Sequence, residues 1–179
     1  MRKLVVTMFV SLDGVIENPA WTAPYWSDEI AAFKGEEMQA SDALLLGRVT
    51  YEGFAQAWPN RTDDPGAEQM NSLPKYVATT TLRDLAWNNS HVLEGDTVTA
   101  IEQLKRQPGK NILVYGSGAL VRTLLRHNLI DEFRLLIYPV VLGAGQRLFN
   151  PGDEATLTLA SAQAMSSGVV GLVYTPAAR

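Results

Sequence analysis

Short apolar runs alternate with segments of helical period along most of the chain, and this alternation restricts the fold more than any other feature of the sequence. Apolar runs short enough to be strands occupy residues 4–10, 43–46, 75–79, 91–93 and 111–115. Segments in which apolar residues recur with helical spacing occupy residues 28–40, 48–57, 97–107 and 119–127. Strands that alternate with helices pair in parallel, because each helix carries the chain back over the sheet. The pattern predicts an α/β fold with a mainly parallel sheet.

The last third of the chain has a different pattern. Residues 132–139 predict one more strand, and the runs 156–165 and 169–175 are separated only by Ser-Ser-Gly at 166–168. Two strands joined by so short a turn predict a β-hairpin, which adds antiparallel strands to the edge of the sheet. No repeat or linker interrupts the sequence, so residues 1–179 are expected to form a single domain.

Local signals mark the ends of several predicted elements. Ser27 is a suitable N-cap, and the two acidic residues after it place negative charge in the first helical turn. Asp96 or Thr97 caps a later helix in the same way. The stretches 17–25 and 60–66 are rich in turn-forming or polar residues and are predicted to be loops.

Composition and charge exclude several classes of function. The net charge of −4, without a basic cluster, argues against a nucleic-acid binder. With no cysteine and only two histidines, neither a disulfide nor a metal site is expected. The apolar segment 4–10 is too short for a membrane span and lacks a cleavage pattern after it. We therefore expect a cytoplasmic protein with no membrane or nucleic-acid partner.

Two places combine an apolar strand, a glycine turn and the start of a helix. The first is Leu-Leu-Leu-Gly-Arg-Val-Thr at 44–50, and the second is Ile-Leu-Val-Tyr-Gly-Ser-Gly-Ala at 112–119. A glycine allows close approach of a ligand, and a helix N-terminus presents free N–H groups with a partial positive charge. Such turns lie together at the carboxyl edge of a parallel sheet. The two turns favour a dinucleotide, although either one alone is more often purely architectural.

The Rossmann dinucleotide fingerprint does not fit the second turn. Val121 stands where that fingerprint requires its third glycine, and an acidic residue about 20 positions later is not evident. A Rossmann dehydrogenase is therefore disfavoured.

In their order along the chain, these and other motifs resemble the dihydrofolate-reductase-like superfamily over nearly the whole sequence. The form of the first and last motifs is most similar to the C-terminal reductase domain of the riboflavin-biosynthesis deaminase/reductases. The matching segments are Ser-Leu-Asp-Gly at 11–14, Gly-Arg-x-Thr-Tyr-Glu at 47–52, the strand and threonines at 75–81, Tyr-Gly-Ser-Gly-Ala-Leu at 115–120, Asp-Glu at 131–132, and Pro139 followed by Leu-Gly-x-Gly at 142–145.

The resemblance implies a three-layer fold with a mixed, mainly parallel sheet of about eight strands, and NADPH as cofactor. It also implies which residues hold each part of the cofactor. Gly47, Arg48 and Thr50 would hold the adenosine and pyrophosphate end, and Thr79, Thr80 and Thr81 would face the 2′-phosphate. The pyrophosphate would be wrapped by Gly116, Ser117, Gly118, Ala119 and Leu120, and the backbone of Val15 and Ile16 would meet the nicotinamide amide.

The resemblance also implies a catalytic acid in the first turn of the helix at 28–40, where Asp28 and Glu29 compete. A buried carboxylate with a raised pKa can supply the proton that accompanies hydride transfer. The alternative is that both carboxylates only favour a helix N-terminus. In true folate reductases a threonine stands beside the acid, and here Leu136 takes that place, which weakens a folate assignment.

Four residues are candidates for substrate binding, and three of them also have a structural interpretation. Asp13 binds substrate, shapes its turn through its side chain, or does both. Trp21 and Trp26 either form a stacking lid over a flat heterocycle or pack a long loop. The fourth candidate for substrate binding is Tyr115, which belongs to the second glycine motif.

The leading hypothesis is an NADPH-dependent reductase of the 5-amino-6-(5-phosphoribosylamino)uracil type, acting on a small heterocycle. Alternatives are reduction of dihydrofolate and a nucleotide-binding module without catalysis, since a fold does not establish a substrate. The resemblance further implies a homodimer, formed through the strands at 156–175.

Overall fold

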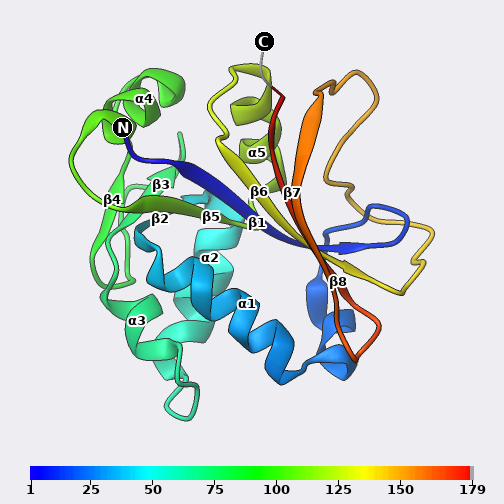
Figure 1. Cartoon of the computed structure of the whole chain (residues 1–179). Helices are drawn as coiled ribbons and strands as arrows, with labels where there is room; N and C mark the ends of the chain where they lie inside the picture. Colours follow the sequence, from blue (N-terminus) through cyan, green and yellow to red (C-terminus); the bar gives the residue numbers. More distant parts are fainter. Residues whose placement is uncertain (178–179) are drawn as a thin grey trace.

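The computed structural model describes residues 1–177, which contain one sheet of eight strands with helices on both faces (Figure 1). The strands lie across the sheet in the order β4-β3-β2-β5-β1-β6-β8-β7. Their bounds are β1 Leu4–Ser11, β2 Ser41–Gly47, β3 Lys75–Ala78, β4 Ser90–Val92, β5 Asn111–Tyr115, β6 Glu132–Tyr138, β7 Leu157–Ala164 and β8 Val170–Pro176. The predicted α/β fold with its mixed, mainly parallel sheet is confirmed, and every predicted strand is present with ends that differ by at most two residues.

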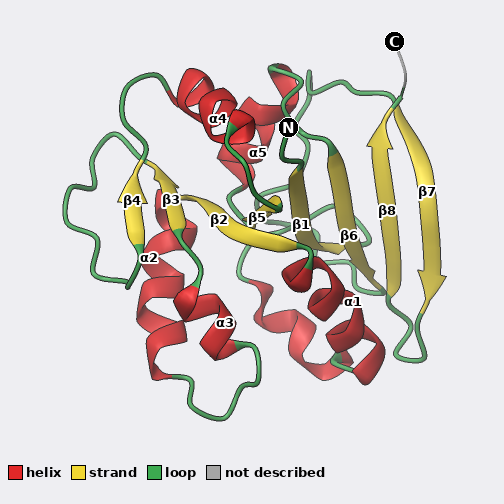
Figure 2. Cartoon of the chain, turned by 60° about the vertical axis from the view of Figure 1, so that its left-hand side comes forward, coloured by secondary structure: helices red, strands yellow, loops and turns green. Residues whose placement is uncertain are grey.

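Strand β1 lies inside the sheet and pairs in parallel with both β5 and β6. The pairs β2–β5, β2–β3 and β3–β4 are also parallel, whereas β8 runs antiparallel to β6 and β7. Figure 2 shows the hairpin of β7 and β8 at the edge opposite β4. After β1 the chain continues toward β2 on one side, and after β5 it continues toward β6 on the other. A topological switch point therefore lies between β1 and β5.

Five α-helices cover the sheet, and the alternation of apolar residues decides which face each one covers. Their bounds are α1 Asp28–Gln39, α2 Arg48–Ala57, α3 Ala67–Ser72, α4 Thr97–Arg106 and α5 Gly118–Arg126. One buried cluster joins Leu4 and Val6 of β1 to α4 and α5. A second joins Val5 of the same strand to α1, α2 and α3. Successive residues of a strand point to opposite faces, so α1–α3 and α4–α5 form the two outer layers (Figure 2).

Three short helices were not expected from the sequence, and one of them is the 3₁₀ helix η2 (Trp58–Asn60) directly after α2. The stretch predicted as a loop at 17–25 contains a 3₁₀ helix, η1 (Pro19–Tyr25), which begins with a proline. Helix α3 is only six residues long, with Ala67 and Met70 as its buried residues. A helix this short presents too few turns for its periodicity to be recognised. Among the described residues, no helix combines the length and the apolar character needed to cross a membrane.

Candidate cofactor and substrate site

The two glycine turns predicted from the sequence are joined to each other by hydrogen bonds. The backbone N–H of Gly47, at the end of β2, donates to Ser117 Oγ over 2.9 Å. The backbone N–H of Ser117 donates to Thr50 Oγ1, also over 2.9 Å, and the Ser117 hydroxyl donates to the Tyr115 carbonyl. The turns after β2 and β5 therefore form one bridged structure at the carboxyl edge of the sheet. The hydroxyls of Ser117 and Thr50 hold this structure together.

Glycine is favoured at two positions of this bridge. Gly116 has φ +52°, and a Cβ there would lie 3.1 Å from Thr50 Oγ1. At Gly118, a Cβ would lie 2.6 Å from the Cδ1 atom of Ile16, closer than any real Cβ contact. The side chain of Ile16, from the segment after β1, thus lies directly against the start of α5. Three segments predicted to bind the cofactor meet here.

The helices that start at the two glycine turns have no side-chain cap. Helix α2 begins after Gly47 and α5 after Ser117, and neither cap residue bonds its helix through its side chain. Neither first turn contains an acidic residue. By contrast, Ser27 caps α1 and Asp96 caps α4, each by accepting a backbone N–H. Two uncapped N-termini at one edge keep free N–H donors and a partial positive charge, which suits a pyrophosphate.

The third predicted cofactor segment follows β3, the neighbour of β2. Thr79 Oγ1 accepts the N–H groups of Thr81 and Leu82 over 3.2 and 3.1 Å, so this hydroxyl shapes the turn. The side chains of Thr80 and Thr81 are exposed. Arg83 donates to the Thr80 carbonyl over 3.0 Å, which holds a guanidinium beside the threonines. Sequence reasoning did not include Arg83, although a cation two residues after a threonine run was a usable signal.

The backbone of Val15 and Ile16 is largely bonded within the chain. The N–H of Val15 donates to Ser11 Oγ over 2.8 Å, and its carbonyl accepts the N–H of Ser11. The N–H of Ile16 donates to the Gln146 carbonyl over 2.8 Å. Of the backbone groups predicted to meet the nicotinamide amide, the Ile16 carbonyl is therefore the one left for a ligand.

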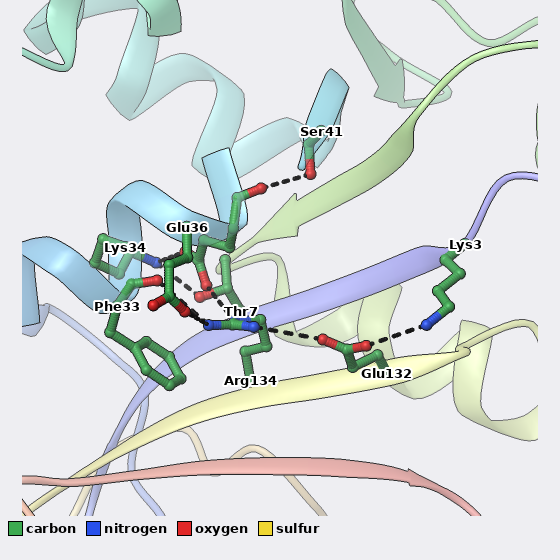
Figure 3. A network of polar contacts seen from close by, with 9 residues as sticks. Lys3, Thr7, Phe33, Lys34, Glu36, Ser41, Glu132 and Arg134 are labelled. Carbon is green, nitrogen blue, oxygen red and sulfur yellow. Dashed lines mark hydrogen bonds and ion pairs between the residues drawn. The ribbon is translucent and has the colours of Figure 1, made fainter. Parts of the chain in front are cut away.

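A buried charged cluster lies between α1 and the sheet (Figure 3), and its Lys34 Nζ lies 4.2 Å from the centroid of the Tyr115 ring. Lys34 Nζ donates to Thr7 Oγ1 over 2.7 Å and forms an ion pair with Glu37. Arg134 of β6 lies 3.4 Å from the other oxygen of Glu37. Sequence reasoning missed this cluster, but a signal was present. Lys34 and Glu37 fall one and two turns after buried Ile30, on the predicted apolar face of the helix, where charges are unexpected.

Comparison with known proteins agrees with this architecture. Residues 2–171 match the family described as the RibD C-terminal domain. The chain belongs to this family. The uncharacterized protein YyaP of Bacillus subtilis is 31% identical, with 97% of this chain and 94% of YyaP aligned. A second relative from the same bacterium, the uncharacterized protein YwjB, is also 31% identical, over 83% of each chain.

Solved structures show that the fold is the dihydrofolate-reductase-like one of the RibD reductase domains. A provisionally named riboflavin biosynthesis protein of Shewanella sp. PV-4 superposes with a TM-score of 0.75 at 21% identity, covering 98% of this chain and 99% of that one. The riboflavin biosynthesis reductase Rib7 of Saccharomyces cerevisiae gives a TM-score of 0.64 at 15% identity, covering 98% and 90% of the two chains. At such identities the likeness establishes the fold.

In this member of the RibD C-terminal domain family, the expectation of a buried acid with a raised pKa is wrong for Glu29. Its carboxylate accepts the backbone N–H of Ser166 over 3.0 Å and also the Ser166 hydroxyl. These hydrogen bonds, the hydroxyl first, lower the pKa of Glu29. Asp28 is exposed at the first position of α1. Glu29 thus ties the β7–β8 turn to α1, a role that sequence reasoning did not foresee.

The carboxylate of Asp13 holds two loops together. Its carboxylate accepts the Ser11 hydroxyl over 2.6 Å and the N–H groups of Leu142 and Gly143 over 3.1 and 2.8 Å. These bonds lower its pKa to about 2, the hydroxyl contributing most. An open groove of about 310 Å³ lies beside it, lined in part by Ile137 and Arg147. The turn-shaping interpretation of Asp13 therefore has direct support.

The aromatic residues of η1 divide between packing and exposure. The Trp21 ring lies edge-on to Tyr138 with centroids 5.5 Å apart, and Trp21 Nε1 donates to the Glu17 carbonyl. Tyr25 meets the same Tyr138 ring at 5.9 Å. Trp26, in contrast, is 58% exposed. Trp21 packs the loop, and Trp26 is the aromatic side chain left free to stack on a ligand.

Proposed function

We propose that this protein is an NADPH-dependent reductase acting on a heterocycle of the 5-amino-6-(5-phosphoribosylamino)uracil type. The observation that carries the proposal is the bridge between the glycine turns after β2 and β5. It brings two uncapped helix N-termini to one edge of the sheet. Membership of the RibD C-terminal domain family and the likeness to Rib7 favour a reductase.

The residues around the bridge suit a dinucleotide with its nicotinamide end toward Ile16 and its adenosine end toward β2 and β3. The N–H groups at the start of α5 come before its first backbone bond, from Val121 to Ser117, and can therefore bind the pyrophosphate. Ile16 lies against Gly118, so the nicotinamide end of the cofactor would lie near the Ile16 carbonyl. A hydride comes from the nicotinamide when the cofactor is bound, and the protein aligns the two reactants.

The adenosine end would lie over β2 and β3, where the donors for a 2′-phosphate are found. Arg48 stands at the first position of α2, 47% exposed. The turn after β3 adds the hydroxyls of Thr80 and Thr81 and the guanidinium of Arg83. A fixed-charge fork and neutral hydroxyls suit a phosphate, whereas an NAD site would place a carboxylate at the ribose.

Cofactor binding and substrate turnover test this proposal separately. Calorimetric titration should show NADPH binding at least ~10-fold tighter than NADH, as expected from one or two charge-assisted contacts. Oxidation of NADPH, followed by absorbance, should then require 5-amino-6-(5-phosphoribosylamino)uracil. Turnover of dihydrofolate in its place would favour the folate alternative. Tight NADPH binding without oxidation by any pyrimidine or pterin would favour a binding module. No binding of NADPH would refute the proposal.

We also propose that the protein forms a homodimer through β7, the outermost strand of the sheet. Seven of its eight residues are exposed, and the sequence Leu-Thr-Leu-Ala-Ser-Ala-Gln-Ala contains no charge and no proline. An edge strand without these protective features pairs readily with another strand. A second copy of the same edge is the simplest partner that would cover it.

A further inference from the structure

The side chain of Lys34 lies against the two strands that flank the topological switch point. Its Nζ atom lies 4.2 Å from the centroid of the Tyr115 ring, at the end of β5, and 5.2 Å from that of Phe9 on β1. These two strands are the neighbours between which the chain changes direction. In open α/β sheets the crevice at such a point, at the carboxyl ends of the strands, is where ligands bind. Tyr115 also directly precedes the Gly116–Gly118 turn assigned to the cofactor.

The ammonium of Lys34 is held firmly and still has donor capacity. Thr7 Oγ1 accepts one N–H, and Glu37 faces a second in an ion pair. An ammonium has three N–H bonds, so within the described part of the chain one remains for another acceptor. The side chain is 13% exposed, so most of it is held inside the protein and a small part meets solvent.

The charges around Lys34 favour release of its proton. Burial lowers the pKa of Lys34, Glu37 opposes this, and the positive charge of Arg134 adds to the lowering. Arg134 also shares the Glu37 carboxylate, at 3.4 Å, and pairs with Glu36 at 3.2 Å. Burial and, to a lesser extent, Glu37 raise the pKa of Tyr115, which therefore stays neutral. The two carboxylates considered from the sequence offer no comparable donor, since Glu29 has a lowered pKa and Asp28 is exposed.

We propose that Lys34 is the proton donor of the reduction and contacts the heteroatom of the substrate's C=N or C=O bond. This inference rests on the proposed function. The carbon of that bond gains the hydride from the bound nicotinamide, the π electron pair moves to the heteroatom, and the heteroatom takes a proton from Lys34 Nζ. The nicotinamide is oxidised and the substrate reduced by two electrons. Lys34, left as a neutral amine, regains its proton from water.

Lys34→Met and Lys34→Arg test the step, with Lys105→Met as a matched control. Lys105 is also a buried lysine on a helix, paired with Asp131 at 2.5 Å, but α4 lies on the opposite face of the sheet. Urea unfolding and calorimetric NADPH titration of all three variants measure folding and cofactor binding independently of turnover. We expect all three to fold and to bind NADPH within ~3-fold of the parent, because Lys34 faces the substrate.

Turnover then separates proton donation from charge. Lys34→Met should lower kcat by at least ~100-fold, the usual contribution of a general acid. Lys34→Arg should stay slow, because a guanidinium keeps the charge but does not release a proton. Lys105→Met should turn over as the parent does. A Lys34→Met enzyme with the parental kcat, or an Arg variant that restores it, would overturn the step while leaving the proposed function intact. A parent that binds NADPH but never oxidises it would remove the proposed function and this step together.

The pH dependence provides a second readout. Four groups face the Lys34 ammonium, namely Glu37 on its own helix, Thr7 on β1, Tyr115 on β5 and Arg134 on β6. A donor must be protonated, so the parental kcat should fall as pH rises through the pKa of Lys34. Tyr115→Phe should keep this alkaline limb, and the residual rate of Lys34→Arg should lack it. Loss of the limb in Tyr115→Phe would make the tyrosine the donor instead.

Discussion

The proposed preference for NADPH depends on Arg48 giving up its ion pair with Glu52 for a contact with the 2′-phosphate. In the structure its guanidinium pairs with Glu52 one turn along α2, Nη1 to Oε2 at 2.9 Å, and the two side chains are 47% and 41% exposed. An exposed pair of this kind is worth ~0.3–0.5 kcal/mol. A charge-assisted contact to a phosphate is worth ~1.5–3 kcal/mol. Giving up Glu52 for a 2′-phosphate therefore leaves a net gain of ~1–2.7 kcal/mol, or roughly 5- to 100-fold in affinity.

Arg48→Ala should accordingly weaken NADPH binding by ~10-fold and leave NADH binding unchanged, since only NADPH carries the 2′-phosphate. Glu52→Gln should strengthen NADPH binding by about twofold, because the ion pair no longer competes. Isothermal calorimetry at low and moderate salt measures both effects. Arg106→Ala is the control, an exposed arginine with a pair to Glu102 on α4, away from the site. Equal loss of affinity for both cofactors in Arg48→Ala would refute the reasoning.

Three further predictions concern stability, the glycine bridge and assembly. Burial lowers the pKa of Lys75 from its usual 10.5 to about 8. Between these values the unfolded chain binds more protons than the folded one, so stability rises with pH there. In urea unfolding, the parent should gain roughly 2 kcal/mol more than Lys75→Met between about pH 7.5 and about pH 9.5, and parallel profiles would contradict this. Gly118→Val should weaken NADPH binding by at least ~10-fold, because its Cβ would collide with Ile16. The control Gly53→Ala, which has open space around it, should bind NADPH as the parent does. Equal NADPH affinity of the two variants would show that the glycine bridge does not bind the cofactor. Leu159→Lys, at a half-exposed position of β7, should convert a dimer into a monomer in light scattering, and a parent that is already monomeric would exclude this interface.

The sequence by itself determined the features that depend on neighbouring residues. Hydrophobic periodicity predicted the strands and the long helices, because side-chain direction repeats every two residues in a strand and every 3.6 in a helix. The alternation of strands with helices then predicted that most of the strands are parallel. The cap of α1 followed from Ser27, and that of α4 was narrowed to Asp96 or Thr97, of which Asp96 is the cap, since a cap bonds an N–H only a few residues away. The two glycine turns were visible for the same local reason.

Only the tertiary structure decided which partners distant residues meet. Glu29 lies 137 residues from Ser166 in the chain, and its use as a tie for the hairpin, with a lowered pKa, was not readable from the first turn of α1. The meeting of Gly47 with Ser117 depended on β2 and β5 becoming neighbours in the sheet. In the same way, Lys34 contacts Thr7 and Tyr115 only because α1 packs over β1 and β5. A pKa, a hydrogen bond or a donor's direction depends on whatever surrounds the group in space, and packing between distant segments sets those surroundings.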